Sequence, residues 1–97
     1  MLVRIVKMTF SPDKVNHFIA AFNERKNLIA GFEGCSGVEL LRDTANPNIF
    51  FTYSHWDKAE SLEAYRKSEL FNTVWHTVKQ WFTDKPEAWS VVVIEKA

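Results

Sequence analysis

The segment at residues 49–56, IFFTYSHW, constrains the fold more than any other part of the chain. Successive side chains of a β-strand point to opposite faces of the sheet, so Phe50 and Trp56 share one face while Phe51 and Tyr53 share the other. Both faces are therefore aromatic, and a sheet built around this strand must be covered on both sides. A chain of 97 residues is one domain long, and we expect its own helices to cover only one side.

The hydrophobic pattern elsewhere predicts three further strands and three helices. The strands are expected at residues 2–10, 38–43 and 89–96, and the helices at 12–30, 57–66 and 69–82. The resulting order, β-α-β-β-α(α)-β, is typical of the ferredoxin-like split βαβ fold. In that α+β fold, a four-stranded antiparallel sheet carries its helices on one face. We therefore expect a single domain of this class over residues 1–97.

Residues with helix-capping preferences mark where the helices begin. Ser11 is an N-cap candidate for the first helix. Asp57 and Glu60 have the spacing of a capping box. Ser68 is expected to cap a separate helix, because Tyr65 falls outside the arc formed by the apolar residues that follow it. The second helical region is therefore predicted to consist of two helices that meet at an angle.

The face of the sheet without helices predicts a partner. A second copy of the chain is the simplest cover, because closed two-fold dimers are the commonest assembly. We therefore expect a homodimer joined through the sheets.

Charge and composition exclude other classes of partner. Twelve basic residues balance twelve acidic ones, which leaves no electrostatic footprint for nucleic acid or an anionic membrane. No apolar run approaches the roughly 18 residues that a membrane span needs, so we expect a cytoplasmic protein. The single cysteine, Cys35, excludes an internal disulfide. With no closely spaced histidine ligands and no glycine-rich nucleotide motif, we expect neither a metal nor a cofactor.

Three sequence features stand out once the chain is laid out on this fold. They are the run GFEGCSGVELLRD at 31–43, the strand end at Trp56 and Asp57, and Ser68 with Phe71 about a dozen residues later. Together they resemble the antibiotic biosynthesis monooxygenase (ABM) domain family of the dimeric α+β barrel group. The resemblance implies a homodimer with a small cavity between sheet and helices in each subunit. It also implies oxidation of phenols or quinols of polycyclic aromatic substrates by O2 without a prosthetic group.

A separate branch of the family that the chain resembles degrades heme, and it uses different residues. That branch uses an asparagine on the first strand, then a tryptophan and a histidine in the second helical region. The matching positions here are Val6 or Lys7, Tyr65 and Trp75, and none of them fits. His76 lies one residue from the histidine position, a shift that rotates a helical side chain by about 100°. Heme degradation is therefore the least favoured alternative.

Aromatic side chains are the candidate substrate-binding residues. The resemblance implies that Tyr65 and Trp75 line the cavity, where two rings suit a flat aromatic substrate. We predict that Phe71 and Trp56 complete this wall, and that Tyr53 on the third strand also binds the substrate.

His55 and Trp56 are the candidate catalytic residues. His55 ends the third strand on the face of Tyr53, and we expect it near the cavity mouth, where a partly desolvated imidazole could act as a general base. A core or interface histidine bonded to the backbone is the alternative. The indole N–H of Trp56 could donate to a developing oxyanion, and the alternative is a plain core tryptophan.

Two functions follow from these residues and the resemblance. The first is a cofactor-independent monooxygenase that acts with O2 on a phenolic or quinol-type aromatic small molecule. The alternative is a non-enzymatic dimeric binding module for a hydrophobic metabolite.

Overall fold

The computed structural model describes residues 1–97 and contains the predicted order of strands and helices. The strands are β1 (Leu2–Thr9), β2 (Cys35–Arg42), β3 (Ile49–Trp56) and β4 (Glu87–Val92), and the helices are α1 (Val15–Ala30), α2 (Ala59–Arg66) and α3 (Glu69–Val78). Two short 3₁₀ turns, η1 (Pro12–Lys14) and η2 (Lys79–Trp81), precede α1 and follow α3. None of the helices is both long and apolar enough to cross a membrane.

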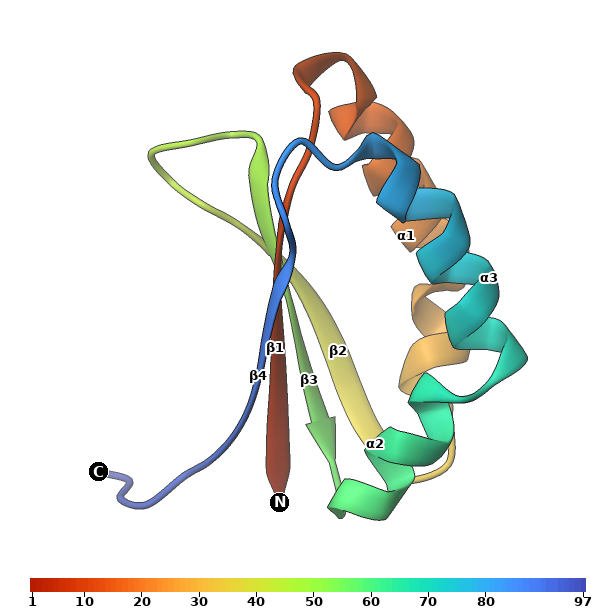
Figure 1. Cartoon of the computed structure of the whole chain (residues 1–97). Coiled ribbons are helices and arrows are strands. Elements are labelled where there is room, and N and C mark those ends of the chain that lie inside the picture. Colours follow the sequence, from red (N-terminus) through yellow and green to blue (C-terminus); the bar gives the residue numbers. More distant parts are fainter.

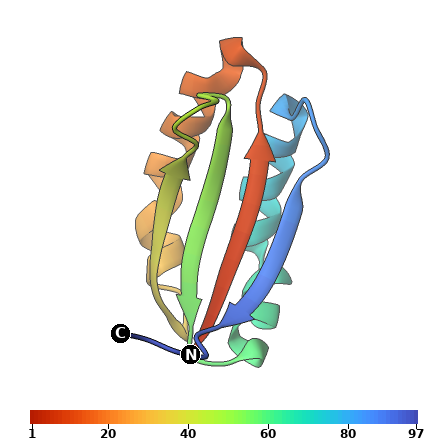
Figure 2. The ribbon, with the colours of Figure 1, turned by 90° about the vertical axis from the view of Figure 1, so that its left-hand side faces the viewer.

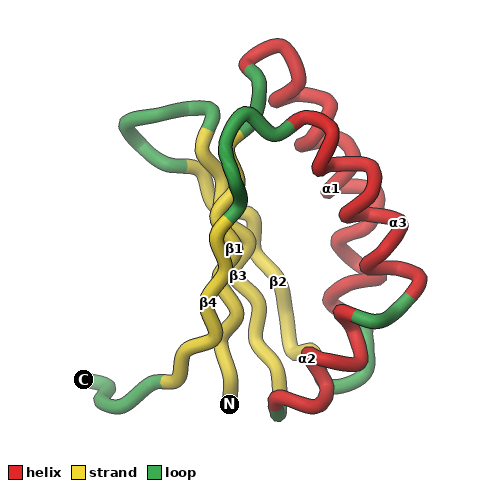
Figure 3. The backbone as a smooth tube through the Cα atoms, viewed as in Figure 1, coloured by secondary structure: helices red, strands yellow, loops and turns green.

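The four strands form one antiparallel sheet in the order β2-β3-β1-β4. All three helices lie against the same face of this sheet, so the molecule has two layers (Figures 1 and 3). Figure 2 shows the opposite face, which no helix covers. The predicted α+β fold, a ferredoxin-like split βαβ arrangement, is therefore confirmed.

The register of the central strands sorts the side chains by residue number. In the β1–β3 pair, Val6 lies opposite Thr52, and Ile5 lies opposite Tyr53. The even-numbered residues of both strands face the helices, where they form the core and line a cavity. The odd-numbered residues face the uncovered side, which we call the outer face.

The second helical region divides at Ser68, as predicted. The backbone N–H of Phe71 donates to Ser68 Oγ over 3.1 Å, which caps the start of α3. The same hydroxyl donates to the carbonyl of Tyr65 over 2.6 Å, near the end of α2. One side chain therefore bonds both helix ends and fixes the turn between them.

The other two predicted caps are absent. The box between Asp57 and Glu60 does not form, and no side chain caps α2. The backbone N–H that Glu60 would reach is that of Asp57, and it already donates to the carbonyl of Gly34 over 2.8 Å. Ser11 does not cap the first helical turn either: no backbone N–H donates to its hydroxyl, which itself donates to the carboxylate of Asp13.

Three strands differ from their predicted bounds. β1 ends at Thr9, one residue early. β4 ends at Val92 instead of residue 96, because Val92 pairs with Leu2, where β1 begins, and the chain beyond it has no strand to bond. β2 begins at Cys35, ahead of its predicted start, because Cys35 already pairs with Trp56 across the sheet.

The core contains an aromatic group at each end of the helix-facing layer. At one end the rings of Phe10, Phe18 and Phe50 lie 4.1 to 5.9 Å apart between centroids. At the other end Trp56 is completely buried, and its indole N–H donates to Ser54 Oγ over 2.9 Å. Because Trp56 is completely buried, this hydrogen bond satisfies an indole N–H that water cannot reach.

We predict that Ser54→Ala lowers the free energy of unfolding by about 1–3 kcal/mol, because it leaves the Trp56 N–H buried without an acceptor. Urea denaturation would measure the loss. Thr52→Val, two residues away on the same face of β3, also removes a hydroxyl but breaks no hydrogen bond of the structure, and it serves as the control. Equal losses in the two variants would show that the hydrogen bond is not what stabilises this end of the core.

Candidate functional site

The sheet and the helices enclose one cavity of about 340 Å³. Its lining is mostly hydrophobic, and it falls in the size range of small-molecule sites. Val6, Met8 and Val38 of the sheet form one wall, and Phe71, Val74 and Trp75 of α3 form the opposite wall. A few polar groups lie among these side chains, including the hydroxyls of Thr52, Ser54 and Tyr65. This combination suits an aromatic or other apolar molecule with a few polar atoms.

A row of aromatic rings runs from the end of β3 along the helical wall. The ring centroids of Trp56 and Tyr65 lie 5.1 Å apart, and those of Tyr65 and Phe71 lie 5.2 Å apart. Phe71 in turn stacks on Trp75 at 5.7 Å with an angle of 11° between the planes. The structure thus brings together Tyr65, Phe71 and Trp75, and all three line the cavity. The turn at Ser68 makes this possible, because it directs rings from two different helices to one site.

Tyr65 is the hydroxyl-bearing ring in this row. Burial raises the pKa of its phenol to about 12, with a smaller contribution from the charge of Cys35. Tyr65 therefore remains protonated at neutral pH and can donate a hydrogen bond but cannot accept a proton as a base. Burial also raises the pKa of the Cys35 thiol, which makes Cys35 a poor nucleophile.

His55 and Tyr53 do not reach the cavity. Both are odd-numbered residues of β3 and lie on the outer face, where their rings are 5.0 Å apart. Neither is among the cavity-lining residues. The predicted position of His55 at the cavity mouth is therefore wrong, because the pleat of the strand directs it to the opposite side of the sheet.

Trp56 lies on the helix-facing side of β3, but it is behind the cavity wall. It is completely buried, it packs against Phe32 and Tyr65, and it does not line the cavity. Its indole N–H is already bonded to Ser54, so it is not free to donate to a developing oxyanion. Of the two alternatives for Trp56, its position therefore fits the plain core tryptophan.

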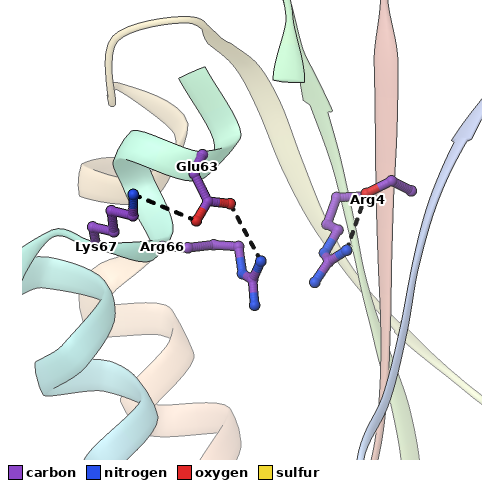
Figure 4. A network of polar contacts seen from close by, with 5 residues as sticks. Arg4, Glu63, Arg66 and Lys67 are labelled. Carbon is purple, nitrogen blue, oxygen red and sulfur yellow. Dashed lines mark hydrogen bonds and ion pairs between the residues drawn. The ribbon is translucent and has the colours of Figure 1, made fainter. Parts of the chain in front are cut away.

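Two arginines that were not predicted also line the cavity. Arg4 extends from β1 on the helix-facing side, and Arg66 extends toward it from the last residue of α2 (Figure 4). Arg4 Nη1 donates to Ser90 Oγ over 3.0 Å, while Arg66 Nη1 lies 3.4 Å from Glu63 Oε2. Burial lowers the pKa of Arg4, and the positive charge of Arg66 lowers it further. The one signal in the sequence was Arg4 itself, a charge on an otherwise apolar strand face.

Acidic and metal-binding side chains are sparse around the cavity. The structure has no group of three or more His, Cys, Asp or Glu side chains that could hold a metal ion. Glu87, at the start of β4, borders the cavity with an exposed side chain.

Solved structures from several organisms share this fold. A protein from Nitrosomonas europaea, provisionally named an antibiotic biosynthesis monooxygenase, has a TM-score of 0.89 at 19% identity, over 98% of this chain and 100% of that one. A similarly named protein from Bordetella bronchiseptica has a TM-score of 0.87 at 20% identity, over 97% of each chain. A conserved protein from Methanosarcina mazei Go1 has a TM-score of 0.87 at 21% identity, over 94% and 91%.

The sequence itself assigns the family. No curated protein matches it significantly. The family model described as antibiotic biosynthesis monooxygenase, however, matches residues 1–77, which include three of the four strands, α1, α2, all but the last residue of α3 and most of the cavity lining. With this match over most of its length, the chain belongs to the antibiotic biosynthesis monooxygenase (ABM) family.

Proposed function

We propose that this protein is a cofactor-independent monooxygenase that oxidises a phenolic or quinol-type aromatic small molecule with O2. The observation that carries the proposal is the cavity of about 340 Å³ with its wall of aromatic rings. Such rings stack on a flat aromatic substrate and exclude water from it. Membership of the ABM family supports the same reaction class.

The substrate supplies all the electrons in the proposed reaction. Loss of the phenolic proton to solvent leaves a phenolate, which passes one electron to O2 and gives a phenoxyl radical and superoxide. These two radicals combine at a ring carbon that bears hydrogen, and the peroxide anion takes up a proton. The hydroperoxide then loses water, which removes the ring hydrogen and one oxygen atom. The product is a quinone, formed from one phenol and one O2 with one water released.

Tyr65 is the protein group suited to assist the peroxide step. Its phenol stays protonated because burial raises its pKa to about 12. It can therefore donate a hydrogen bond to an oxygen anion that develops in the cavity, as preorganised donors do in other enzymes. Its inability to accept a proton favours the second candidate, a binding module that holds an aromatic metabolite without oxidising it.

We predict that the protein consumes O2 in the presence of at least one member of a panel of naphthols and hydroquinones, and that Val38→Phe abolishes this uptake. The larger ring would fill part of the cavity at the cost of about 1–3 kcal/mol of stability from overpacking. An oxygen electrode measures uptake against a boiled control, and circular dichroism checks the fold.

Leu28→Phe is the matched control, because Leu28 lies on α1, is 57% exposed and is not among the cavity-lining residues. If Val38→Phe still oxidised the substrate, the cavity would not be the site of the reaction. Tight binding of the same phenols with no uptake of O2 would instead favour the binding module.

We also propose that two copies of the chain associate through their outer faces. This face carries the rings of Phe51, Tyr53 and His55, together with Trp89 and Val91 at 42% exposure each. An apolar surface of this kind is typical of an interface. An obligate dimer of this kind would bury about 2,000 Å² or more in total. His55 and Tyr53 would then contact the second copy rather than the substrate.

We predict that sedimentation at micromolar concentration gives twice the chain mass of 11.3 kDa, and that Trp89→Glu gives a monomer because it buries an unpaired charge in the interface. Leu28→Glu places the same charge on an exposed apolar position of α1, away from the sheet, and should leave the dimer intact. A monomeric parent protein would contradict the proposal.

A further inference from the structure

We propose that Arg4 and Arg66 form an anion-binding subsite of the cavity, and that the natural ligand is an aromatic molecule that carries an anionic oxygen group. The inference rests on the proposed function in one respect, the use of the cavity for an aromatic ligand. It adds a chemical requirement that aromatic walls alone do not impose.

The two guanidinium groups face the same space from different layers of the fold. Arg4 is half-buried on the central strand β1, and Arg66 is exposed at the end of α2. Figure 4 shows the two side chains extending toward each other across the gap between helix and sheet, and both line the cavity. Because Arg66 is exposed, the cavity opens to solvent beside it. A ligand can therefore place its rings inside and its charged group between the arginines.

Arg4 forms no direct ion pair within the protein, although the negative charge of Glu63 offsets part of the effect of burial and Arg66 on its pKa. Its hydrogen bond goes to the neutral hydroxyl of Ser90, and it makes no ion pair. A guanidinium has five N–H donors, so most of its capacity remains available. A half-buried cation without a direct ion pair, beside a second cation, is an unfavourable arrangement that a bound anion would relieve.

The acidic residues nearby do not neutralise the pair. Glu63 is shared between Arg66 and Lys67, at 3.4 and 3.9 Å, and its side chain is 50% exposed. Glu87 borders the cavity from β4 but is exposed and forms no ion pair with either arginine. The side of the cavity next to α2 therefore carries an excess of positively charged side chains, and most of the remaining lining is hydrophobic.

The planar guanidinium matches an anionic oxygen group closely. Arginine binds a carboxylate through two parallel N–H···O bonds, and charge-assisted bonds of this kind are stronger than neutral ones. An ionised phenol presents the same negative oxygen. For a phenolic substrate, the subsite would favour the ionised form, which is the electron-rich species that reacts with O2. Two cations would then assist the ionisation for which the cavity offers no base other than the exposed Glu87 at its border.

The test compares matched ligands that differ only in charge, in the absence of turnover. We expect the parent protein to bind 2-naphthoate at least about tenfold more tightly than 2-naphthamide in a fluorescence titration, as a charged hydrogen bond provides. Arg66→Gln should remove this preference by weakening 2-naphthoate alone. Lys67→Gln is the control, because Lys67 is the next residue, bonds the same Glu63 and does not line the cavity. It should change either affinity by less than about threefold.

A second arm uses 2-naphthol, whose own ionisation is followed by absorbance. Binding should lower the pKa of the naphthol by about one unit in the parent protein, the equivalent of the same tenfold preference. Arg66→Gln should abolish the shift, and Tyr65 does not ionise in this range. A charge preference lost on Arg66→Gln in either arm supports the subsite and identifies a carboxylate or a phenolate as its ligand.

Three results would overturn the inference. They are equal binding of the charged and neutral ligands, equal effects of Arg66→Gln and Lys67→Gln, and a loss of 2-naphthamide binding as large as that of 2-naphthoate. The last would show that Arg66 contributes packing rather than charge. Because binding is measured without O2 uptake, a protein that binds 2-naphthoate through Arg66 but oxidises no phenol would retain the subsite and lose only the proposed oxidation.

Discussion

The alternation of side chains along β1 and β3 is the constraint on which the rest of the structure depends. These two strands form the centre of the sheet, and both are apolar on both faces. Their even-numbered side chains enter the helix-facing layer, and their odd-numbered side chains lie on the face that no helix covers. A shift of one residue in either strand would exchange the cavity lining for the outer face. The fold therefore separates two apolar surfaces: one lines the cavity between the sheet and the helices, and the other is the outer face that no helix covers.

The hydroxyl of Ser68 determines how α2 and α3 meet. It caps α3 and also bonds the carbonyl of Tyr65 at the end of α2, so the two helices meet at a fixed angle. A continuous helix would place Tyr65 and Phe71 on different sides of its axis. The angle instead brings their rings to 5.2 Å and holds Tyr65 against Trp56. It also leaves α3 standing away from the sheet along part of its length, and the cavity occupies that space.

The sequence predicted the fold class, the bounds of β3 and the helix break at Ser68, because each depends on local periodicity or capping. It did not predict which face of β3 would receive the helices. A strand that is aromatic on both faces carries no such information, and His55 was therefore expected at the cavity although Trp56 pointed the other way. Nor did it predict Arg66 at the cavity, because the approach of this side chain to Arg4 depends on how α2 lies against the sheet rather than on a local pattern. The bounds of β4 follow from its pairing with Leu2, a contact distant in sequence that no local pattern encodes.

The polar groups of the cavity and the aromatic rings of its walls would act on a ligand in different ways. Stacked rings hold any flat molecule of suitable size, so they distinguish ligands poorly. Tyr65 adds a hydrogen-bond donor whose pKa of about 12 keeps it neutral, and the arginines add charge that no change of pH near neutrality removes. None of these groups accepts a proton. These groups promote ionisation of a phenol by stabilising the anion, which requires the oxygen to lie near Arg4 and Arg66. The position of the ligand and the chemistry of its oxidation would then be set by the same pair of charges.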